Sequence, residues 1–392
     1  MTSFTIPYNK PYLSGNETKY IVDAVKSGKI SGNGIFTQRC HQFFQTRYRF
    51  PKVLLTTSCT DALEMAAILA DIQPGDEVIV PSYTFVSTAL AFVRQGASIV
   101  FADSSLENPN LDIRQLEALI SPRTKAIVPV HYAGVACNMD PIMALANRYN
   151  LLVIEDAAQA IDGYYKGKPL GSIGHLAAFS FHETKNIISG EGGMLVINDE
   201  RFFRRAEIIW EKGTNRSEFF RGEVDTYGWV DIGSSFLPSE IVSAFLYAQL
   251  ENLDDIQKRR IALWNYYYQA LEPLANTGAF RLPVLPDYSS NNAHLFYLIC
   301  QNETDRSRLI DTLKAEGILA VFHYLSLHRS HYYQAKHDGR VLPFADTYAD
   351  CLVRLPLFYE LSFAEIDRIV NLINSLYSKE VYVEAVHHYG QL

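Results

Sequence analysis

The sequence comprises 392 residues, of which 48% are hydrophobic and 20% are charged. That length exceeds what a single hydrophobic core usually supports, so we expect one large domain and one smaller domain. The net charge of -8, with no basic stripe to offset it, argues against nucleic acid as a partner.

Short apolar runs alternate with helical patterns from about residue 52 onward. The runs are rich in Val and Ile and bounded by turns, which is typical of strands buried on both faces. They read KVLLTTS, DEVIVPSYTF, SIVFAD, KAIVPVHYAG, LLVIEDAAQ, LAAFSF and GGMLVIND. Between them lie the helical segments TDALEMAAILADI, VSTALAFVRQG, IRQLEALIS and MDPIMALANRYN. This alternation predicts an α/β/α sandwich around a mostly parallel, seven-stranded sheet.

The pattern changes after residue 200. Residues 201–236 are polar and aromatic and are predicted to be rich in loops, whereas residues 238–274 have helical spacing with a bend near Asn252. Mixed strand and helix patterns follow from about residue 276. We therefore expect a large domain over residues 1–250, with an N-terminal arm, and a small α+β domain over residues 251–392.

The sequence predicts a cytoplasmic protein without a metal site. No apolar run is long enough to span a bilayer, so no membrane is expected as a partner, and the N-terminus lacks the charged and apolar regions of a secretory signal. The cysteines are scattered without a C-x-x-C pair, which suits reduced thiols and argues against structural zinc. They are Cys40, Cys59, Cys137, Cys300 and Cys351.

Two residues at the ends of predicted strands suggest a first hypothesis about the ligand of this protein. Asp156 follows the run LLVIE, and Lys185 follows the run LAAFSF. Ligands of such sheets bind beyond the carboxyl ends of the strands, so both side chains could face one crevice. The pair would suit pyridoxal 5'-phosphate, whose aldehyde needs an amine of lowered pKa and whose pyridine nitrogen needs a carboxylate. Alternatively, Asp156 caps a helix and Lys185 is a surface side chain.

The segment TTSCTDALEM could hold the phosphate of such a cofactor. Thr60 and the backbone amides of Asp61 and Ala62 would lie at a helix N-terminus, which favours a dianion. Simple capping by Ser58 or Thr60 is the alternative. Phe85, just past a strand, could stack on a flat heterocycle or belong to the core. The sequence has no G-x-G-x-x-G after a strand and no Walker A motif, which weakens the dinucleotide and nucleoside triphosphatase alternatives.

Taken in order, the motifs EDAAQ, FSFHETKN and GEGG resemble those of the DegT/DnrJ sugar-nucleotide aminotransferases, and the resemblance runs over nearly the whole chain. It implies a fold-type-I pyridoxal-phosphate enzyme and a homodimer with shared active sites. Lys185 then matches the lysine that bonds to the cofactor. Asp156 matches the partner of the pyridine nitrogen, and Gln159 matches the residue near the ring hydroxyl.

The resemblance also implies positions for the phosphate and for a stacking ring. These are Thr60, the amide of Asp61, Ser180 and Phe85. Many members place an asparagine where this sequence has Leu237, and that asparagine reaches the partner subunit's phosphate. Ser234 or Ser235 could replace it.

Within the family, the sequence looks like the transaminases that make dTDP-4-amino-4,6-dideoxygalactose for enterobacterial common antigen. This resemblance rests on segments such as KVLLTTSCTDALEMAA, EKGTNRSEFFRGEVDTYGWVDIGSS and AVFHYLSLH. The implied substrates are L-glutamate and dTDP-4-dehydro-6-deoxyglucose. The residues expected to hold the sugar nucleotide are Lys212, Arg216, Arg221, Tyr324 and His328. A solvated charged loop is the alternative for residues 212–221.

Two other functions stay open at this point. The enzyme could make the gluco epimer at C4, or a 3-amino sugar from a 3-keto substrate. The chain could instead be a non-catalytic paralogue that binds cofactor or nucleotide as a regulator. Retention of Lys185, Asp156 and Gln159 argues against the regulator. Related dehydratases carry histidine at the lysine position, so Lys185 favours transamination.

Overall fold

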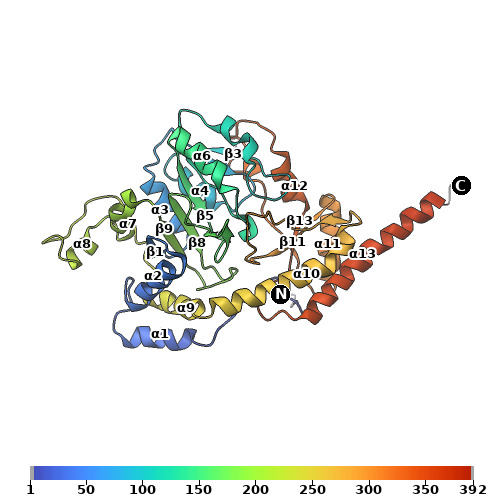
Figure 1. The fold of residues 1–392 in the computed structure, drawn as a ribbon, viewed down its shortest axis with the longest axis horizontal. Helices are drawn as coiled ribbons and strands as arrows, with labels where there is room; N and C mark the ends of the chain where they lie inside the picture. The colour runs from blue at the N-terminus through green and yellow to red at the C-terminus, as the bar shows by residue number, and fades with distance from the viewer. Residues whose placement is uncertain (1–3, 390–392) are drawn as a thin grey trace.

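The computed structural model describes the backbone of residues 4–389 and the side chains of residues 4–378. A seven-stranded sheet forms the centre of the larger part of the molecule (Figure 1). In spatial order its strands are β1 (Lys52–Thr56), β9 (Gly193–Ile197), β8 (Leu176–Ser180), β5 (Leu152–Asp156), β4 (Thr124–Ile127), β2 (Glu77–Pro81) and β3 (Ser98–Ala102). Strand β9 is antiparallel to its neighbours β1 and β8, and the other pairs are parallel. The predicted mostly parallel, seven-stranded sheet is confirmed.

Helices cover both faces of this sheet because successive strand residues point to opposite sides. Leu54, Val80 and Ile154 pack on one face, with helices α3 (Cys59–Leu69), α4 (Ser87–Val93) and α7 (Phe203–Trp210). Leu55 and Val153 pack on the opposite face. The helices there are α2 (Ile35–Tyr48), α5 (Ile113–Leu116), α6 (Met139–Tyr149) and α9 (Glu240–Leu250). These two apolar layers make the α/β/α sandwich that the sequence predicts.

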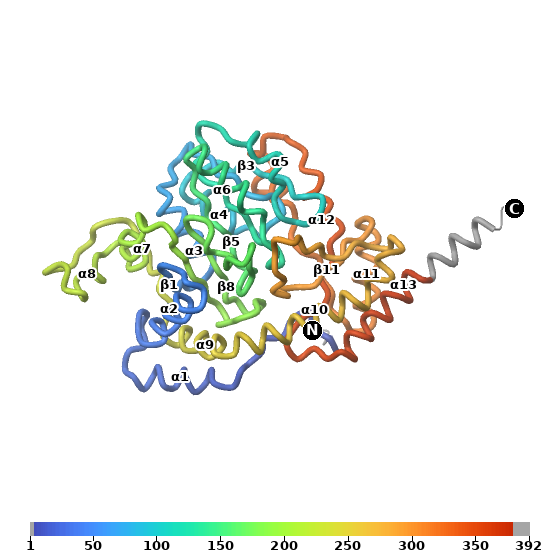
Figure 2. Tube along the Cα trace, viewed as in Figure 1, coloured from blue at the N-terminus to red at the C-terminus, as the bar shows by residue number. Residues whose placement is uncertain are grey.

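A second, antiparallel sheet lies in the C-terminal part of the chain. Its order is β10 (Phe280–Arg281), β11 (Phe296–Cys300), β13 (Leu352–Leu355) and β12 (Val321–Phe322). The helices of this part are α10 (Leu253–Ala275), α11 (Glu303–Ala315), α12 (Pro343–Cys351) and α13 (Phe363–Tyr389). Helix α10 runs from beneath the large sheet to the small one (Figure 2).

The remaining elements are short or peripheral. They are α1 (Glu17–Lys26), α8 (Arg216–Phe220), the hairpin β6 (Tyr164–Tyr165) and β7 (Lys168–Pro169), and the 3-10 turns Glu117–Leu119, Tyr132–Gly134, Glu200–Phe202 and Leu327–Arg329. None of the helices in the described part of the chain is long and apolar enough to span a membrane.

The predicted boundary after residue 250 falls between α9, which ends at Leu250, and α10, which begins at Leu253. The N-terminal arm, which the sequence places with the large domain, contacts the small one. Ile6 packs in the core of the small domain and pairs with Ile318 in a parallel bridge. The arm thereby carries Tyr8 to the junction between the two domains, where Tyr8 lines a cleft.

Candidate active site

A cleft of about 900 Å³ opens beyond the carboxyl ends of β5 and β8, between the large sheet and the small domain. It brings together eight residues that the sequence predicts for cofactor or substrate. These are Thr60, Asp61, Phe85, Asp156, Gln159, Ser180, Lys185 and Tyr324. The strand-end position is the one expected for a ligand site in a parallel α/β sheet.

Lys185 reaches the cleft from the turn that joins β8 to β9. Two hydrogen bonds close this turn, from the Glu183 amide to the Gly190 carbonyl at 2.8 Å and from the Ser189 amide to the Phe181 carbonyl at 2.7 Å. Burial lowers the pKa of Lys185 below its usual 10.5, and the positive charge of Arg354 acts in the same direction. A lysine with a lowered pKa spends more time as the neutral amine, which is the nucleophilic and basic form.

Asp156 ends strand β5 and is 5% exposed. Its carboxylate accepts hydrogen bonds from the Thr88 hydroxyl at 2.7 Å and from the Ala158 amide at 3.1 Å. Burial raises its pKa from 3.8, although these hydrogen bonds and Lys185 oppose the shift. No described residue lies close enough to Asp156 to form an ion pair with it. A buried carboxylate of this kind fits a ligand that presents an N–H group.

The N-terminus of α3 faces the same cleft. Ser58 caps this helix, because its hydroxyl accepts a hydrogen bond from the Asp61 amide at 3.1 Å. The start of the helix is therefore both capped by Ser58 and placed at the cleft, two possibilities that the sequence offers as alternatives. The Thr60 hydroxyl lies 2.8 Å from that of Ser87. A side chain at Gly193 would collide with the backbone of Ser58, so glycine in β9 allows the helix start to lie against the sheet. Hydroxyls at a helix N-terminus suit a phosphate group.

Gln159 and Tyr324 join the two domains across the cleft. The side-chain Oε1 of Gln159 accepts a hydrogen bond from the Ala133 backbone amide at 2.6 Å, and its Nε2 donates to the Tyr324 hydroxyl at 3.0 Å. The Phe85 ring is 55% exposed and lies 6.1 Å from the Tyr324 ring, centroid to centroid. Phe85 is therefore not a core residue, and its free face is available to a planar ligand.

Other predicted residues lie outside this cleft. His328 is 7% exposed, its Nδ1 lies 2.7 Å from the Ser82 hydroxyl, and it is not among the residues that line the cleft. Lys212 and Arg216 are exposed on the segment around α8. Ser234 and Ser235, which follow this segment in the sequence, are also exposed. The roles of these residues in binding stay predictions.

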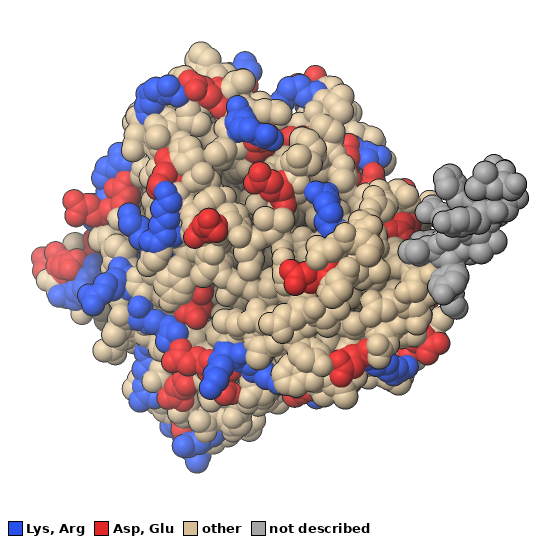
Figure 3. All heavy atoms as spheres, turned by 45° about the vertical axis from the view of Figure 1, so that its right-hand side comes forward, with Lys and Arg blue, Asp and Glu red and all other residues tan. Residues whose placement is uncertain are grey.

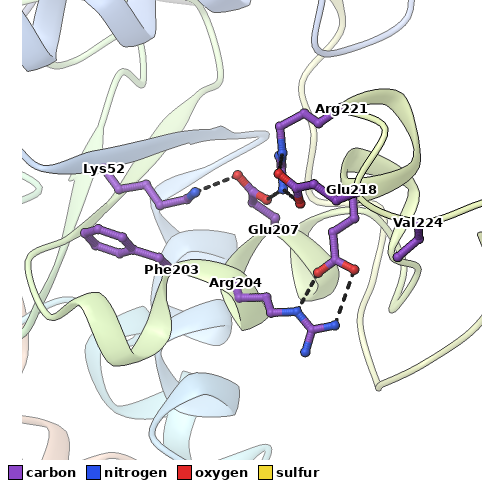
Figure 4. A pocket seen from close by; sticks show the side chains of 8 residues that line it. Lys52, Phe203, Arg204, Glu207, Glu218, Arg221 and Val224 are labelled. Atoms are coloured by element: carbon purple, nitrogen blue, oxygen red, sulfur yellow. Dashed lines mark hydrogen bonds and ion pairs between the residues drawn. The ribbon is translucent and has the colours of Figure 1, made fainter.

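Arg221 belongs to a separate charged hollow, shown in Figure 4. Its guanidinium pairs with Glu223 at 2.8 Å and with Glu207 at 2.9 Å, and Glu207 also accepts from Lys52 at 2.6 Å. Hydrogen bonding to Glu223 and Glu207 raises the pKa of Arg221. Its charge is thus already matched within the protomer. On the face drawn in Figure 3, acidic and basic side chains are likewise interspersed.

Apart from Tyr324, the cleft residues that come from the small domain and the arm are not indicated by the sequence. These are Tyr8, His294, Phe322, His323 and Arg354. One signal was present for Arg354, because a lone arginine interrupts the apolar run CLVRLPLF. Nothing in the local pattern around Tyr8 marks it as a site residue.

The family model of the DegT/DnrJ/EryC1/StrS aminotransferases matches residues 11–374. The chain belongs to this family. It is 34% identical over 373 residues to the GDP-perosamine synthase of Caulobacter vibrioides, covering 93% of this chain and 96% of that protein.

Solved structures of sugar aminotransferases share the fold. DesV of S. venezuelae, solved in complex with a ketimine intermediate, is 29% identical, with a TM-score of 0.86 and coverage of 96% of this chain and 99% of that chain. A Streptococcus pneumoniae protein named as a sugar aminotransferase, in its PLP form, is 25% identical, with a TM-score of 0.86 and coverage of 95% and 99%. The protein is a pyridoxal-phosphate-dependent sugar aminotransferase of fold type I.

The residues present fit that cofactor. A buried carboxylate without a cationic partner, an amine of lowered pKa, a helix N-terminus lined with hydroxyls and an exposed aromatic face all open into one cleft. When bound, pyridoxal 5'-phosphate supplies a carbonyl that condenses with amines and a ring that withdraws electrons. Within that arrangement, Asp156 would hold a proton on the ring nitrogen, and Lys185 would accept and return protons beside the reacting carbon.

Proposed function

We propose that the enzyme transfers the amino group of L-glutamate to C4 of dTDP-4-dehydro-6-deoxy-D-glucose. The products would be 2-oxoglutarate and dTDP-4-amino-4,6-dideoxy-D-galactose, a precursor for enterobacterial common antigen or a similar surface polysaccharide. One observation supports the amino-transfer chemistry: Lys185 and Asp156 line the same cleft. The choice of sugar rests on the sequence similarity in segments such as EKGTNRSEFFRGEVDTYGWVDIGSS.

A second acceptor is favoured by one comparison. The relative from Caulobacter vibrioides is named a GDP-perosamine synthase, so its product is a GDP-linked amino sugar. At 34% identity, a change of nucleotide or of sugar stereochemistry is compatible with a common fold and a common amino-transfer site. The gluco epimer at C4 and a 3-amino sugar are further products that the same chemistry allows.

Product analysis distinguishes these substrates. We expect purified holoenzyme with L-glutamate to consume dTDP-4-dehydro-6-deoxyglucose and to release an axial C4 amine, identified by the proton couplings of the sugar ring in NMR. An equatorial amine would show that the product is the gluco epimer and not the galacto sugar. Turnover of a GDP-linked 4-keto sugar in place of the dTDP sugar would overturn the substrate proposal and keep the amino-transfer chemistry.

We also propose a cytoplasmic homodimer in which the segment around α8 contacts the second subunit. Trp229 is 84% exposed and Phe220 is 69% exposed, and the neighbouring Tyr227, Val230 and Ile232 are each more than half exposed. Apolar side chains gathered in this way usually mark a protein interface. Figure 1 shows this segment projecting from the body of the molecule.

The dimer would give the exposed residues of this segment a role. Lys212, Arg216, Ser234 and Ser235 would reach the cleft of the partner subunit and contact the phosphates there. Light scattering should report twice the chain mass of 44.3 kDa. Trp229→Asp should shift the protein toward the monomer and lower activity, since each site would lose its neighbour's residues. A wild-type chain that stays monomeric at assay concentration would contradict the proposal.

A further inference from the structure

His294 is a nearly buried residue that lines the cleft from the segment just before β11. Three buried side chains hold it in place. Its backbone amide donates to Asn292 Oδ1 at 3.0 Å, and its carbonyl oxygen accepts from the Arg260 guanidinium at 2.6 Å. Its ring Nδ1 lies 2.8 Å from Asn186 Oδ1. Of the polar groups of His294, only Nε2 makes no hydrogen bond within the described part of the chain.

The hydrogen bonds of Asn186 determine which ring nitrogen of His294 carries the proton. The side-chain amide nitrogen of Asn186 lies 2.8 Å from the Asn292 carbonyl oxygen and 2.8 Å from Gln257 Oε1. A backbone carbonyl can only accept, so this atom is indeed the nitrogen, and the atom that faces His294 is the oxygen. The oxygen accepts a hydrogen bond from Nδ1–H. In a neutral ring, Nε2 is then left with a lone pair.

The surroundings keep the ring of His294 neutral. Burial lowers its pKa well below 6.5, and the positive charges of Lys185, Arg260 and Arg354 act in the same direction. No carboxylate pairs with the ring among the residues that the structure describes. Nε2 is therefore a hydrogen-bond acceptor at neutral pH.

The position of Nε2 limits which donor it can meet. Because Nδ1 faces Asn186, Nε2 on the other side of the ring is the nitrogen left to face the cleft. Asn186 directly follows Lys185 in the chain, and Lys185 and His294 line the same cleft. The ring therefore lies beside the reacting amine, and a ligand group that meets Nε2 is attached close to the reacting carbon.

Of the two proposed substrates, the sugar has the matching group. Glutamate brings carboxylates, which a lone pair repels, and an amine that itself reacts. In a 4-keto-6-deoxy sugar, the reacting C4 lies between C3, which carries a hydroxyl, and C5, which carries the ring oxygen and a methyl group. The C3 hydroxyl is thus the hydrogen-bond donor next to the reacting carbon.

We propose that Nε2 of His294 accepts a hydrogen bond from the C3 hydroxyl of the keto sugar, and that Asn186 acts as a positioning residue by fixing the ring. A buried acceptor left without its partner is costly, so this contact selects sugars that carry the hydroxyl. The inference rests on the amino-transfer function and assigns a specificity-determining residue within it.

A deoxy sugar tests the proposal on the wild-type enzyme. The pyridoxamine form is assayed with dTDP-4-dehydro-6-deoxyglucose and with the analogue that lacks the C3 hydroxyl. We expect kcat/KM to be about tenfold lower for the analogue, the size of effect expected for one buried hydrogen bond. Equal kcat/KM values for the two sugars would overturn the proposal.

Two substitutions distinguish the two ring nitrogens. The side-chain amide of His294→Asn can still donate to Asn186 but places no acceptor where Nε2 lies, whereas His294→Gln can place an amide oxygen there. We expect His294→Asn to lose the preference for the hydroxylated sugar and His294→Gln to keep part of it. A full preference in His294→Asn would contradict the assignment. The control His331→Asn changes an exposed histidine that does not line the cleft, and should keep the wild-type preference.

The melting temperature and the visible band of the cofactor show whether each variant is folded and loaded. If His294→Asn is not, His294→Gln and the wild-type comparison of the two sugars carry the test. The tautomer has its own readout, because nitrogen NMR of histidine-labelled enzyme should show a protonated Nδ1 and an unprotonated Nε2 for His294. The opposite tautomer would overturn the proposal.

The glutamate half-reaction separates this role from donor binding. Holoenzyme titrated with L-glutamate, followed by the visible absorbance of the cofactor, should reach half-saturation at the same concentration in His294→Asn as in wild type. A larger effect on glutamate than on the sugar would assign His294 to the donor and contradict the proposal. If the wild type uses another keto sugar in place of the dTDP sugar, the acceptor proposal fails. That other sugar, without the hydroxyl beside its ketone, then decides the role of His294.

Discussion

Lys185→Met is expected to lower kcat for amino transfer by about a thousandfold or more, because it removes the group that bonds to the cofactor and moves protons beside it. Lys185 lines the cleft, and burial there keeps its pKa below 10.5. The loss should appear in kcat, measured under saturating donor and acceptor. It should also appear in the spectrum, since the cofactor would no longer be held covalently.

A matched lysine controls for charge and expression. Lys166 is exposed and pairs with Asp140 at 2.7 Å, so Lys166→Met should leave kcat unchanged. The pH profile gives a second check on Lys185. Only a neutral amine accepts a proton, so the rate should rise with pH and level off below the usual lysine pKa of 10.5. Near-normal turnover by Lys185→Met would contradict its assignment as the catalytic residue.

Asp156→Asn is expected to lower kcat by about a hundredfold, the size of effect seen when one charge-stabilising group is removed from an active site. Asparagine keeps the shape of the side chain; its Oδ1 can still accept from the Ala158 amide, and its Nδ2 would donate to the Thr88 hydroxyl in place of accepting from it. It cannot hold the positive charge that a protonated pyridine nitrogen would carry. The loss should therefore fall on kcat more than on the KM of either substrate.

The exposed Asp140 provides the comparison, because Asp140→Asn removes a carboxylate that does not line the cleft and should not change kcat. Burial raises the pKa of Asp156, so its carboxylate gains a proton at a higher pH than an exposed aspartate as the solution is acidified. Activity should accordingly fall on the acidic side in the wild type. An Asp156→Asn enzyme with wild-type kcat would show that this carboxylate does not act on the cofactor.

The large sheet was predictable because its strands are buried on both faces. Runs such as LLVIE and GGMLV are almost wholly apolar, and this pattern alone marks β5 and β9. The strand ends then indicate Asp156 and Lys185, since polar side chains that follow such runs lie at the ligand-binding edge. The antiparallel direction of β9 carries no such signal, because a buried strand reads the same in either direction.

Contacts between distant segments could not be predicted in the same way. The role of Arg221 in binding a diphosphate stays a prediction, but its pairing with Glu207 and Glu223 could not be predicted, because only the folded chain brings these carboxylates around it. The burial of His328 against Ser82 could not be predicted for the same reason, and its role near the substrate also stays a prediction. The cleft positions of Tyr8 and Arg354 depend on how the arm and the small domain pack against the large one, which no local pattern encodes.

Peptide mapping tests most directly whether Lys185 bonds to the cofactor. Holoenzyme is reduced with borohydride, which fixes the carbon–nitrogen bond between lysine and cofactor, and is then digested and analysed by mass spectrometry. We predict that the cofactor mass is found on the peptide spanning AAFSFHETKNIISG, at Lys185. Attachment at another lysine, or no attachment in a protein that binds the cofactor and turns over substrate, would contradict the account.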